Sequence, residues 1–383
     1  MNSIEQFIWS ETFWFPEGYT WKDMENVPGS NIYLPNRNDM LWSIPLGIIL
    51  WGVRYIFEQY LMTPIGYWCG VKKQNSADHL KPNAVLENYF QKNGITSNNN
   101  LESISKQTDM TVREVERWLR NRKAKSVIKD ITKFRECGWH FTFYLGIFIY
   151  GLVVLWNKKW FWETKYCWKG WPTLDVPREI YWYYMVELSF YWCLVFSMLT
   201  EHKRKDFNQM IVHHIATILL MSFSWATNFV RIGCIVLLTH DAADFPMAAA
   251  KMMKYSGHKK ACEFFLGVFI VVWVLSRLIY YPVVALYSAT FEAYEIVGKW
   301  VAHILFVVLL VTLQILHLIW TYMIARIAYR SVYKNKVTSK SHIFIAICIL
   351  HSIWMGYKYV QIVTPASVCF IGLILALILP KLI

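Results

Sequence analysis

Two adjacent histidines and a His-Asp-x-x-Asp pattern are the residues of this sequence best suited to do chemistry. His213 and His214 lie together in one apolar stretch, and His240, Asp241 and Asp244 lie near the end of the next. An ionisable side chain inside a membrane is costly, so each of these residues indicates a functional site. A carboxylate that orients an imidazole makes histidine a good base or nucleophile, able to activate an amine or an alcohol toward a thioester.

These two groups are expected to meet. At a rise of about 1.5 Å per residue, the histidine pair lies roughly 10 Å below one membrane surface. The next helix runs in the opposite direction, which places its histidine and two aspartates roughly 10–17 Å below the same surface. The sequence therefore predicts two antiparallel helices that bring imidazole and carboxyl groups to one level.

Helical spacing distinguishes the two adjacent histidines. Residues seven before, four before and four after a position share its helix face. These residues are polar for His213 and apolar for His214, namely Asp206, Gln209 and Thr217 against Phe207, Met210 and Ile218. We therefore predict His213 as the reacting residue and His214 as its support.

Two other interpretations of the cluster stay open. Histidine and aspartate are both metal ligands, although three histidines are too few for the His-rich boxes of membrane di-iron enzymes. The cluster can also be a purely structural set of hydrogen bonds between helices. The 8 cysteines form no CxxC pair, which indicates neither a zinc site nor a disulfide framework. We expect no metal and no resident cofactor.

The elements that must position these residues are membrane-spanning helices. Hydrophobic residues make up 56% of the chain and charged residues 17%, against about 25% charged in a typical globular domain. Apolar windows near the length of a crossing, about 20 residues, recur along the chain. They are Leu41–Leu61, Trp139–Trp156, Tyr181–Thr200, Phe207–Ser224, Phe229–Pro246, Phe264–Leu286 and Val301–Ile324, followed by His342–Gly356 and Tyr359–Ile383. The predicted fold is an all-α polytopic membrane bundle of about seven spans, or eight to nine with the last two.

The charge distribution gives the orientation and the domain organisation. The net charge is +13, and the basic segments after the first, third, fifth and seventh spans all fall on one side, which the positive-inside rule makes cytosolic. We divide the chain into a lumenal segment (1–40), a first span (41–61), a polar cytosolic insert (71–135), a six-helix catalytic membrane domain (139–335) and a hydrophobic C-terminal segment (336–383).

Other polar residues lie within the predicted spans. Glu187 and Tyr191 share a face of the third span, as suited to a structural role as to lining a pocket. Gln314, His317 and Thr321 share a face of the seventh, where hydrogen bonds between helices are expected. Arg277 lies near the lumenal end of the sixth span, and we expect it to snorkel to the surface.

The polar insert contains three expected helices. They are Asn83–Asn93, Leu101–Gln107 and a third that Asp109 or Thr111 can cap. The end of the third helix resembles the recognition helix of a homeodomain. In that family the residue matching Trp118 is in the core and the residue matching Asn121 reads adenine, while basic residues, here Arg120, Arg122, Lys123 and Lys125, hold phosphates. We expect this helix to face anionic lipid, with DNA binding as the less favoured alternative.

The membrane domain is similar to the ceramide synthases. The resemblance is carried by His213-His214, Ser222–Asn228, Arg231–Gly233, His240-Asp241-Ala-Ala-Asp244 and Ala250–Met252, with Glu187–Trp192 and Lys203–Phe207 upstream. It extends over roughly residues 7–335 in unbroken order. It implies N-acylation of a sphingoid long-chain base, sphinganine or sphingosine, by a fatty acyl-CoA in the endoplasmic reticulum membrane.

The resemblance also implies roles for single residues. His213 would take the acyl group as an acyl-imidazole or act as a base toward the amine, with Asp241 and Asp244 orienting the imidazoles and His240 completing the site. The expected substrate-binding residues are Lys203, Arg204 and Lys205, which suit the phosphates of CoA, together with Glu187, Tyr191, Asn228 and Arg231. Membrane lipids and a second chain, in a homo- or heterodimer, are further expected partners, and DNA is not.

The loop before the final span is associated in this family with the choice of acyl chain. Here it is expected at Phe291–Trp300 and contains Glu292, Tyr294, Glu295 and Gly298. Its Glu-Ile-Val-Gly sequence resembles members that favour palmitoyl-length chains.

Two functions of other classes stay open. One is a membrane-tethered regulator whose homeodomain-like insert binds DNA. The other is a lipid transporter or sensor in which the histidine and aspartate cluster titrates or gates without turnover.

Overall fold

The computed structural model describes residues 9–30, 32–71, 83–93, 101–200 and 206–335, with the side chains of all but 91–93, 123–129, 200 and 327–335. In this part of the chain all regular secondary structure is helical. Two compact units are formed. The first contains residues up to Arg54, Thr142–Pro246 and the chain from Gly267, and the second contains Tyr55–Phe141 and Met247–Leu266.

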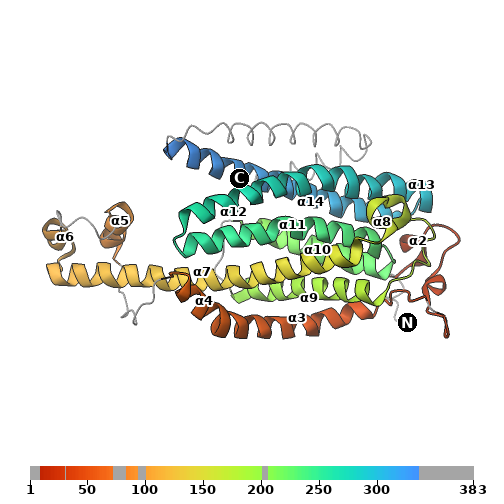
Figure 1. Ribbon diagram of the computed structural model, residues 1–383, viewed down its shortest axis with the longest axis horizontal. Coiled ribbons are helices and arrows are strands. Elements are labelled where there is room, and N and C mark those ends of the chain that lie inside the picture. Colours follow the sequence, from red (N-terminus) through yellow and green to blue (C-terminus); the bar gives the residue numbers. More distant parts are fainter. Residues whose placement is uncertain (1–8, 31, 72–82, 94–100, 201–205, 336–383) are drawn as a thin grey trace. The chain divides into compact units, whose positions relative to one another are not determined.

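The first unit is a bundle of long helices. Helix α10 (Phe207–Ala226) packs against α9 (Arg178–Thr200) and α14 (Val301–Asn335), and α14 also packs against the π-helical segment η5 (Val274–Leu286). Figure 1 shows α9, α10, α11 (Val230–Tyr255) and α14 running along one another. The sequence-predicted membrane bundle is therefore present.

Six helical stretches of the described chain are long and apolar enough to cross a membrane, which makes this a multi-pass membrane protein. They are Asp39–Trp68, Asp130–Leu155, Phe207–Ala226, Val230–Tyr255, Lys259–Val297 and Val301–Arg326. The predicted third span, Tyr181–Thr200, corresponds to α9, which has 23 residues but does not belong to this apolar set. Most of α9 is buried between other helices, so its tyrosines and Glu187 face protein and it needs less apolar character. The predicted C-terminal spans, His342–Gly356 and Tyr359–Ile383, lie outside the described residues.

The expected loop before the last span is mostly helical. Residues Ser288–Glu292 and Ala293–Val297 continue the helix that begins at Lys259, so the predicted end at Leu286 was too early. The chain turns only at Gly298, whose φ of +102° is a conformation that favours glycine. The next helix, α14, begins at Val301, so Trp300 lies in the turn at the end of the bundle.

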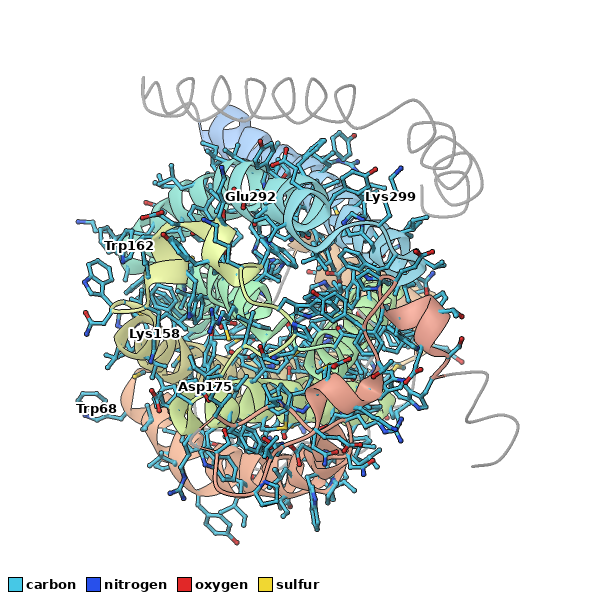
Figure 2. The ribbon with its side chains drawn as sticks, turned by 90° about the vertical axis from the view of Figure 1, so that its right-hand side faces the viewer. Trp68, Lys158, Trp162, Asp175, Glu292 and Lys299 are labelled. Atoms are coloured by element: carbon cyan, nitrogen blue, oxygen red, sulfur yellow. The ribbon has the colours of Figure 1, made fainter. Side chains whose placement is uncertain are left out.

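Aromatic side chains close the end of the bundle at which α2 (Glu11–Trp14), η1 (Trp21–Met24), α8 (Lys159–Trp162) and η4 (Thr164–Cys167) lie. We call it the aromatic end. Trp171 stacks on Phe229 with ring centroids 5.4 Å apart, and the indole of Trp225 donates to the carbonyl of Asn36 at 2.9 Å. Figure 2 looks onto this end, with Lys158 and Trp162 at its rim. These contacts tie the N-terminal segment and the α8–η4 loop to the long helices.

The second unit contains a small three-helix domain. Its helices are α5 (Ala84–Asn93), α6 (Leu101–Thr108) and the start of α7 (Val112–Leu155), and its core holds Leu86, Tyr89, Ile104, Val115, Trp118 and Leu119. Thr111 caps α7 as expected. Its hydroxyl and backbone N–H both donate to Glu114 at 2.8 Å, and the backbone bond holds the pKa of this carboxyl below its usual value. The order and core of these helices agree with the homeodomain-like prediction.

Helix α7 joins the insert to a membrane span without a break. It has 44 residues, so the predicted boundary between residues 135 and 139 falls inside one helix. The recognition-like end of the insert is thus continuous with a span that begins at Asp130.

The residues of α7 predicted to contact nucleic acid or lipid differ in how exposed their side chains are. Arg122 donates two hydrogen bonds of 2.6 Å to Glu87, and its guanidinium lies 5.1 Å from the ring of Phe90. It therefore helps to hold the insert together, and its contact with phosphates stays a prediction. Arg120 is exposed and Asn121 is half-buried, while the side chains of Lys123 and Lys125 lie outside the described part.

Trp118→Ala is expected to unfold the insert locally, because removing a buried indole costs about 3–5 kcal/mol. Hydrogen exchange in the full-length protein should accelerate at residues 84–93 and 101–121 and remain slow in α10 and α11. Arg120→Ala, at an exposed position of the same helix, is the matched control. Unchanged exchange in Trp118→Ala would contradict this account of the core.

Candidate functional site

Four imidazoles from three helices meet inside the first unit. His213 and His214 come from α10, His240 from α11 and His317 from α14, and each is at most 8% exposed. The ring centroids of His213 and His240 lie 6.3 Å apart, and those of His240 and His317 lie 4.9 Å apart. The histidines of α10 therefore lie close to the histidine of α11, and α14 contributes a fourth imidazole to the group.

Hydrogen bonds fix the protonation pattern of the inner pair. Nδ1 of His240 lies 2.7 Å from the carbonyl oxygen of Val236, which can only accept, so this nitrogen carries the hydrogen. Nε2 of neutral His240 is then an acceptor, and Nε2 of His317 donates to it across 3.1 Å. The expected interhelical hydrogen bonding of His317 is confirmed, and a backbone carbonyl, not a carboxylate, orients His240.

Arg277 lies in the centre of this group. Its Nη2 donates to the carbonyl of His240 at 2.5 Å and to the Asp244 carboxylate at 3.1 Å, and its guanidinium lies 4.9 Å from the ring of Trp273. Nη1 also approaches Nε2 of His317, at the longer distance of 3.4 Å. The arginine is only 3% exposed, so the prediction that it snorkels to the surface was wrong. The polar bundle interior supplies partners that hydrocarbon cannot.

The two predicted aspartates do different things. Asp244 binds Arg277 and so acts on the histidines through that guanidinium. Asp241 is 1% exposed and interacts electrostatically with Glu187 of α9, which is fully buried. Among the described residues, Oδ2 of Asp241 and both carboxyl oxygens of Glu187 have no hydrogen-bond partner. Direct orientation of His240 by a carboxylate, as expected from the sequence, is therefore corrected: consecutive helical residues point about 100° apart, so Asp241 faces α9 when His240 faces α14.

Nδ1 of His213 is not held by a hydrogen bond of this kind. Its Nδ1 is buried and has no hydrogen-bond partner within the described structure. Trp320 contacts the ring edge-on at a centroid distance of 5.3 Å, and Tyr191 lies 6.2 Å from it and 5.9 Å from His214. A neutral imidazole held by aromatic contacts, with a nitrogen still available, can serve as a nucleophile or base.

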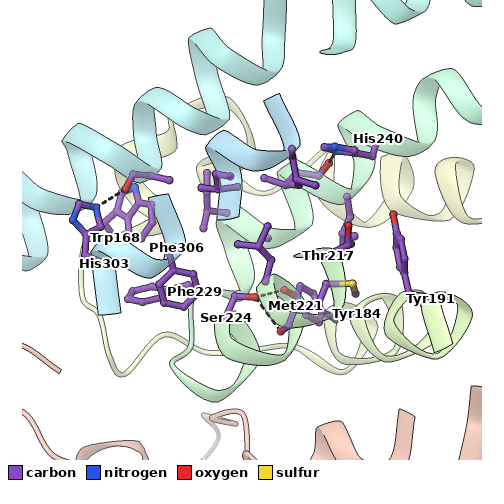
Figure 3. Close-up of a pocket in the computed structure, with 18 of the residues that line it drawn as sticks. Trp168, Tyr184, Tyr191, Thr217, Met221, Ser224, Phe229, His240, His303 and Phe306 are labelled. Atoms are coloured by element: carbon purple, nitrogen blue, oxygen red, sulfur yellow. Dashed lines mark hydrogen bonds between the residues drawn. The ribbon is translucent and has the colours of Figure 1, made fainter. Parts of the chain in front are cut away.

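An apolar cavity begins beside the histidines. The empty space among its lining residues is about 670 Å³, a figure that includes the part of the cavity open to its surroundings. Figure 3 shows His240, Tyr191 and Thr217 at one end and Trp168 and His303 at the other. His303 and Leu313 both line it from α14, so it extends roughly 15 Å along that helix. Such a space suits a long, flexible apolar chain.

Two predicted substrate-binding residues lie outside this lining. The amide nitrogen of Asn228 donates to the carbonyls of Pro172 and Leu174 at 2.7 and 2.8 Å, and Arg231 donates to the carbonyl of Tyr166 at 2.9 Å. Arg231 thus holds η4 on the bundle and Asn228 holds the chain that follows η4, so both have a structural role, and their contact with substrate stays a prediction. Tyr191 does line the cavity, whereas Glu187 does not. The basic residues Lys203, Arg204 and Lys205 lie outside the described chain.

The four residues predicted to select the acyl chain do not line the cavity either. Glu292 accepts a 2.6 Å hydrogen bond from the hydroxyl of Thr164, Tyr294 and Glu295 are exposed, and Gly298 forms the turn. Glu292 and the neighbouring Lys299 lie at the aromatic end (Figure 2). Their neighbours Ala289, Trp300 and His303 do line the cavity, so this segment can influence the chain indirectly.

Sequence reasoning missed Arg277 as a member of the site and gave His317 only a structural bond. Both carried a usable signal, since each is an ionisable residue within a span. No group of three or more His, Cys, Asp and Glu side chains in the described structure has a geometry that could hold a metal ion.

Comparisons with known proteins assign the membrane domain and the insert to two protein families. Residues 133–326 match the TLC domain family of TRAM, LAG1 and CLN8 proteins, and residues 82–126 match the homeodomain family. The chain is 39% identical over 335 residues to ceramide synthase 5 of Homo sapiens, covering 87% of this chain and 84% of the relative. It is 36% identical over 337 residues to ceramide synthase 3 of Mus musculus, covering 88% and 87%, and 33% identical over 338 residues to ceramide synthase 4 of Homo sapiens, covering 88% and 85%.

Arg277→Met is expected to destabilise the bundle by about 3 kcal/mol, because it removes the cation of a buried pair. Thermal unfolding of the purified protein in detergent should show a Tm lower by several degrees. Asp244→Asn should also destabilise, and the double variant should lose less than the sum of the two. Strictly additive losses would show that the pair does not act as one unit.

Proposed function

Because this chain belongs to the ceramide synthase family and is an acyltransferase, we propose that it transfers a fatty acyl group from acyl-CoA to the amine of a sphingoid base. The resemblance found in the sequence is confirmed by these matches. The observation that carries the choice of substrates is the apolar cavity that starts at His240 and Tyr191, beside His213. It can hold the acyl chain with the thioester carbonyl at the histidines.

In the proposed first step, an imidazole nitrogen of His213 attacks the thioester carbonyl. The carbon–sulfur bond breaks, CoA leaves as its thiol or thiolate, and an acyl-imidazole forms. Neutral imidazole is the nucleophilic form, and its burial among Trp320 and Tyr191 excludes water that would hydrolyse the acyl group.

In the second step, the amine attacks the acyl carbon, the acyl–nitrogen bond to His213 breaks and an amide forms. The amine must lose a proton. Nε2 of His240 already accepts from His317, so we assign the proton to Nδ1 of His317, which has no hydrogen-bond partner in the described structure. Arg277 and Asp244 act as positioning residues, because they hold the backbone carbonyl of His240. We propose that this cycle uses no metal and no resident cofactor.

The cavity also bears on chain length. An extended chain advances about 1.2 Å per bond, so the roughly 15 Å between His303 and Leu313 accommodates roughly 12 bonds. A few more carbons reach the histidines from there. The expected preference for palmitoyl-length chains is consistent with this length.

The remaining assignments are proposals that the family likeness supports. We propose an endoplasmic reticulum location and binding of the CoA phosphates by Lys203, Arg204 and Lys205, whose charge suits them. We further propose pairing with a second chain as a homo- or heterodimer, and contact of the exposed Arg120 side of the insert with anionic lipid.

His213→Ala is expected to lower ceramide formation at least about a thousandfold, as the loss of a nucleophile does in other enzymes. Intact-protein mass spectrometry of the wild type with palmitoyl-CoA alone should reveal an acyl adduct that sphinganine then removes. The variant should form no adduct.

The control matched to His213→Ala is His303→Gln, which replaces a histidine at the far end of the same cavity. It should still acquire the adduct. An active wild type with no adduct would leave His213 as a base instead of a nucleophile, and an active His213→Ala would refute both roles.

Trp168→Ala should shift the acyl-CoA preference toward longer chains. The indole closes the far end of the cavity, and its removal leaves room there for additional methylenes, each worth about 0.8 kcal/mol when buried. A competition among acyl-CoA substrates of increasing length measures the shift. Tyr322→Ala, on an exposed face of α14, is the control, and an unchanged length profile in Trp168→Ala would mean that the chain ends elsewhere.

A further inference from the structure

Two buried carboxyl groups face each other beside the histidines, and we call them the acid pair. Glu187 of α9 is 0% exposed and Asp241 of α11 is 1% exposed, and the two groups interact directly. Both carboxyl oxygens of Glu187 and Oδ2 of Asp241 have no hydrogen-bond partner in the described structure. A carboxylate can only accept hydrogen bonds, so two carboxyl groups in contact can bond to each other only when one of them carries a proton.

The surroundings of the acid pair do not favour two negative charges. The charged groups that act on it are Asp244 and Arg277, and these two already form an ion pair of 3.1 Å with each other. The fully buried hydroxyl of Tyr183 lies within electrostatic range of both carboxyl groups and has no hydrogen-bond partner among the described residues, so it can donate to one oxygen. Two adjacent charges repel strongly in a protein interior, and one proton with one negative charge is the state that these neighbours support.

The acid pair lies close to the imidazoles. Asp241 follows His240 directly in α11, and Glu187 lies four residues, about 6 Å along the helix, before Tyr191 in α9. The ring of Tyr191 is 6.2 Å from that of His213, and Figure 3 shows Tyr191 and His240 at the same end of the cavity. A charge on the acid pair therefore acts on the histidines at which the second step is proposed to occur.

That second step creates a cation inside the bundle. When Nδ1 of His317 takes the proton of the amine, the neutral imidazole becomes an imidazolium. Its Nε2 lies only 3.4 Å from Nη1 of Arg277, so two cations then lie side by side. Asp244 balances one of them, and the second cation needs a further negative charge because the interior cannot solvate it as water does.

We propose that the acid pair keeps a single proton, and that its remaining negative charge balances the imidazolium while the amide forms. The inference rests on the proposed acyl transfer and adds Glu187 to it as a positioning residue, which acts through the histidines. The proton of the acid pair stays in place during the step. The N–H bond of the amine breaks, its electron pair stays on nitrogen, and the proton bonds to Nδ1 of His317, from which solvent takes it after the product leaves.

The test measures the two steps separately in the purified full-length protein. The acyl adduct is formed with palmitoyl-CoA alone, and its discharge by sphinganine is timed by mass spectrometry. Glu187→Gln and Asp241→Asn each leave one carboxylate, which can accept from the new amide, so each should slow discharge only about threefold. The double variant has no negative charge at this position and should slow discharge about a hundredfold, far more than the roughly ninefold expected from independent effects.

Adduct formation is the internal reference, because departure of CoA as its thiol leaves no charge on the protein. It should fall much less than discharge in the double variant. Glu179→Gln is the matched control, since it makes the same change on α9 at a carboxylate that binds Lys158 at 3.2 Å and is partly exposed. Its discharge rate should equal that of the wild type. Independent effects of the two single substitutions, or equal slowing of both steps in the double variant, would overturn the proposal.

Infrared spectroscopy detects the shared proton without turnover. The wild type should show the C=O stretch of a protonated carboxyl group at neutral pH, and either single variant should lose it because the remaining group is ionised. A wild type without this band, or a band that persists in a single variant, would also overturn the proposal. If the wild type forms no ceramide at all, the acyl transfer is refuted, whereas the band still decides whether the acid pair holds one proton.

Discussion

The hydrogen bonds of Arg277 hold the centre of the protein together. A guanidinium at 3% exposure in a membrane bundle is tolerated only where every neighbour helps to satisfy it, and here Asp244, the His240 carbonyl and the face of Trp273 do so. Because the same arginine touches residues of α11 and approaches His317 of α14, the positions of the histidines depend on its being in place. The ion pair thus links the stability of the bundle to the geometry of the site.

The histidine pair and the cavity divide the work of an acyltransferase in space. At the polar end, the imidazoles of His240 and His317 are oriented by the hydrogen bond between them and by the backbone carbonyl of Val236. The cavity beyond it is lined almost wholly by apolar side chains. In the proposed cycle, a thioester at their junction has its reacting carbon beside His213 and its chain in a region from which water is excluded. The same separation would protect the proposed acyl-imidazole until an amine arrives.

The three-helix insert is tied to the membrane by the continuity of α7. A recognition-like helix that runs into a span at Asp130 is held at the membrane surface, and its Arg122 is already committed to Glu87. Both facts favour a role at the lipid surface over sequence-specific DNA binding. The homeodomain likeness, which the family match at residues 82–126 confirms, therefore describes a fold whose usual function does not follow from it.

Periodicity and composition were sufficient to predict the helices, because a span must be long and apolar and an amphipathic helix must repeat its face. The same local signals identified His213, His214, His240 and the two aspartates as ionisable side chains within spans, whose burial costs free energy and therefore indicates a function. They could not show that Asp241 points toward Glu187 while Asp244 reaches Arg277, since that depends on which helix packs on each side of α11. Nor could they show that Asn228 and Arg231 hold a loop, or that Trp168 and Trp300, 132 positions apart, close one cavity. The sequence determined which residues are expensive to bury, and only the tertiary structure decided which of them share a hydrogen bond, because that depends on contacts between segments distant in the chain.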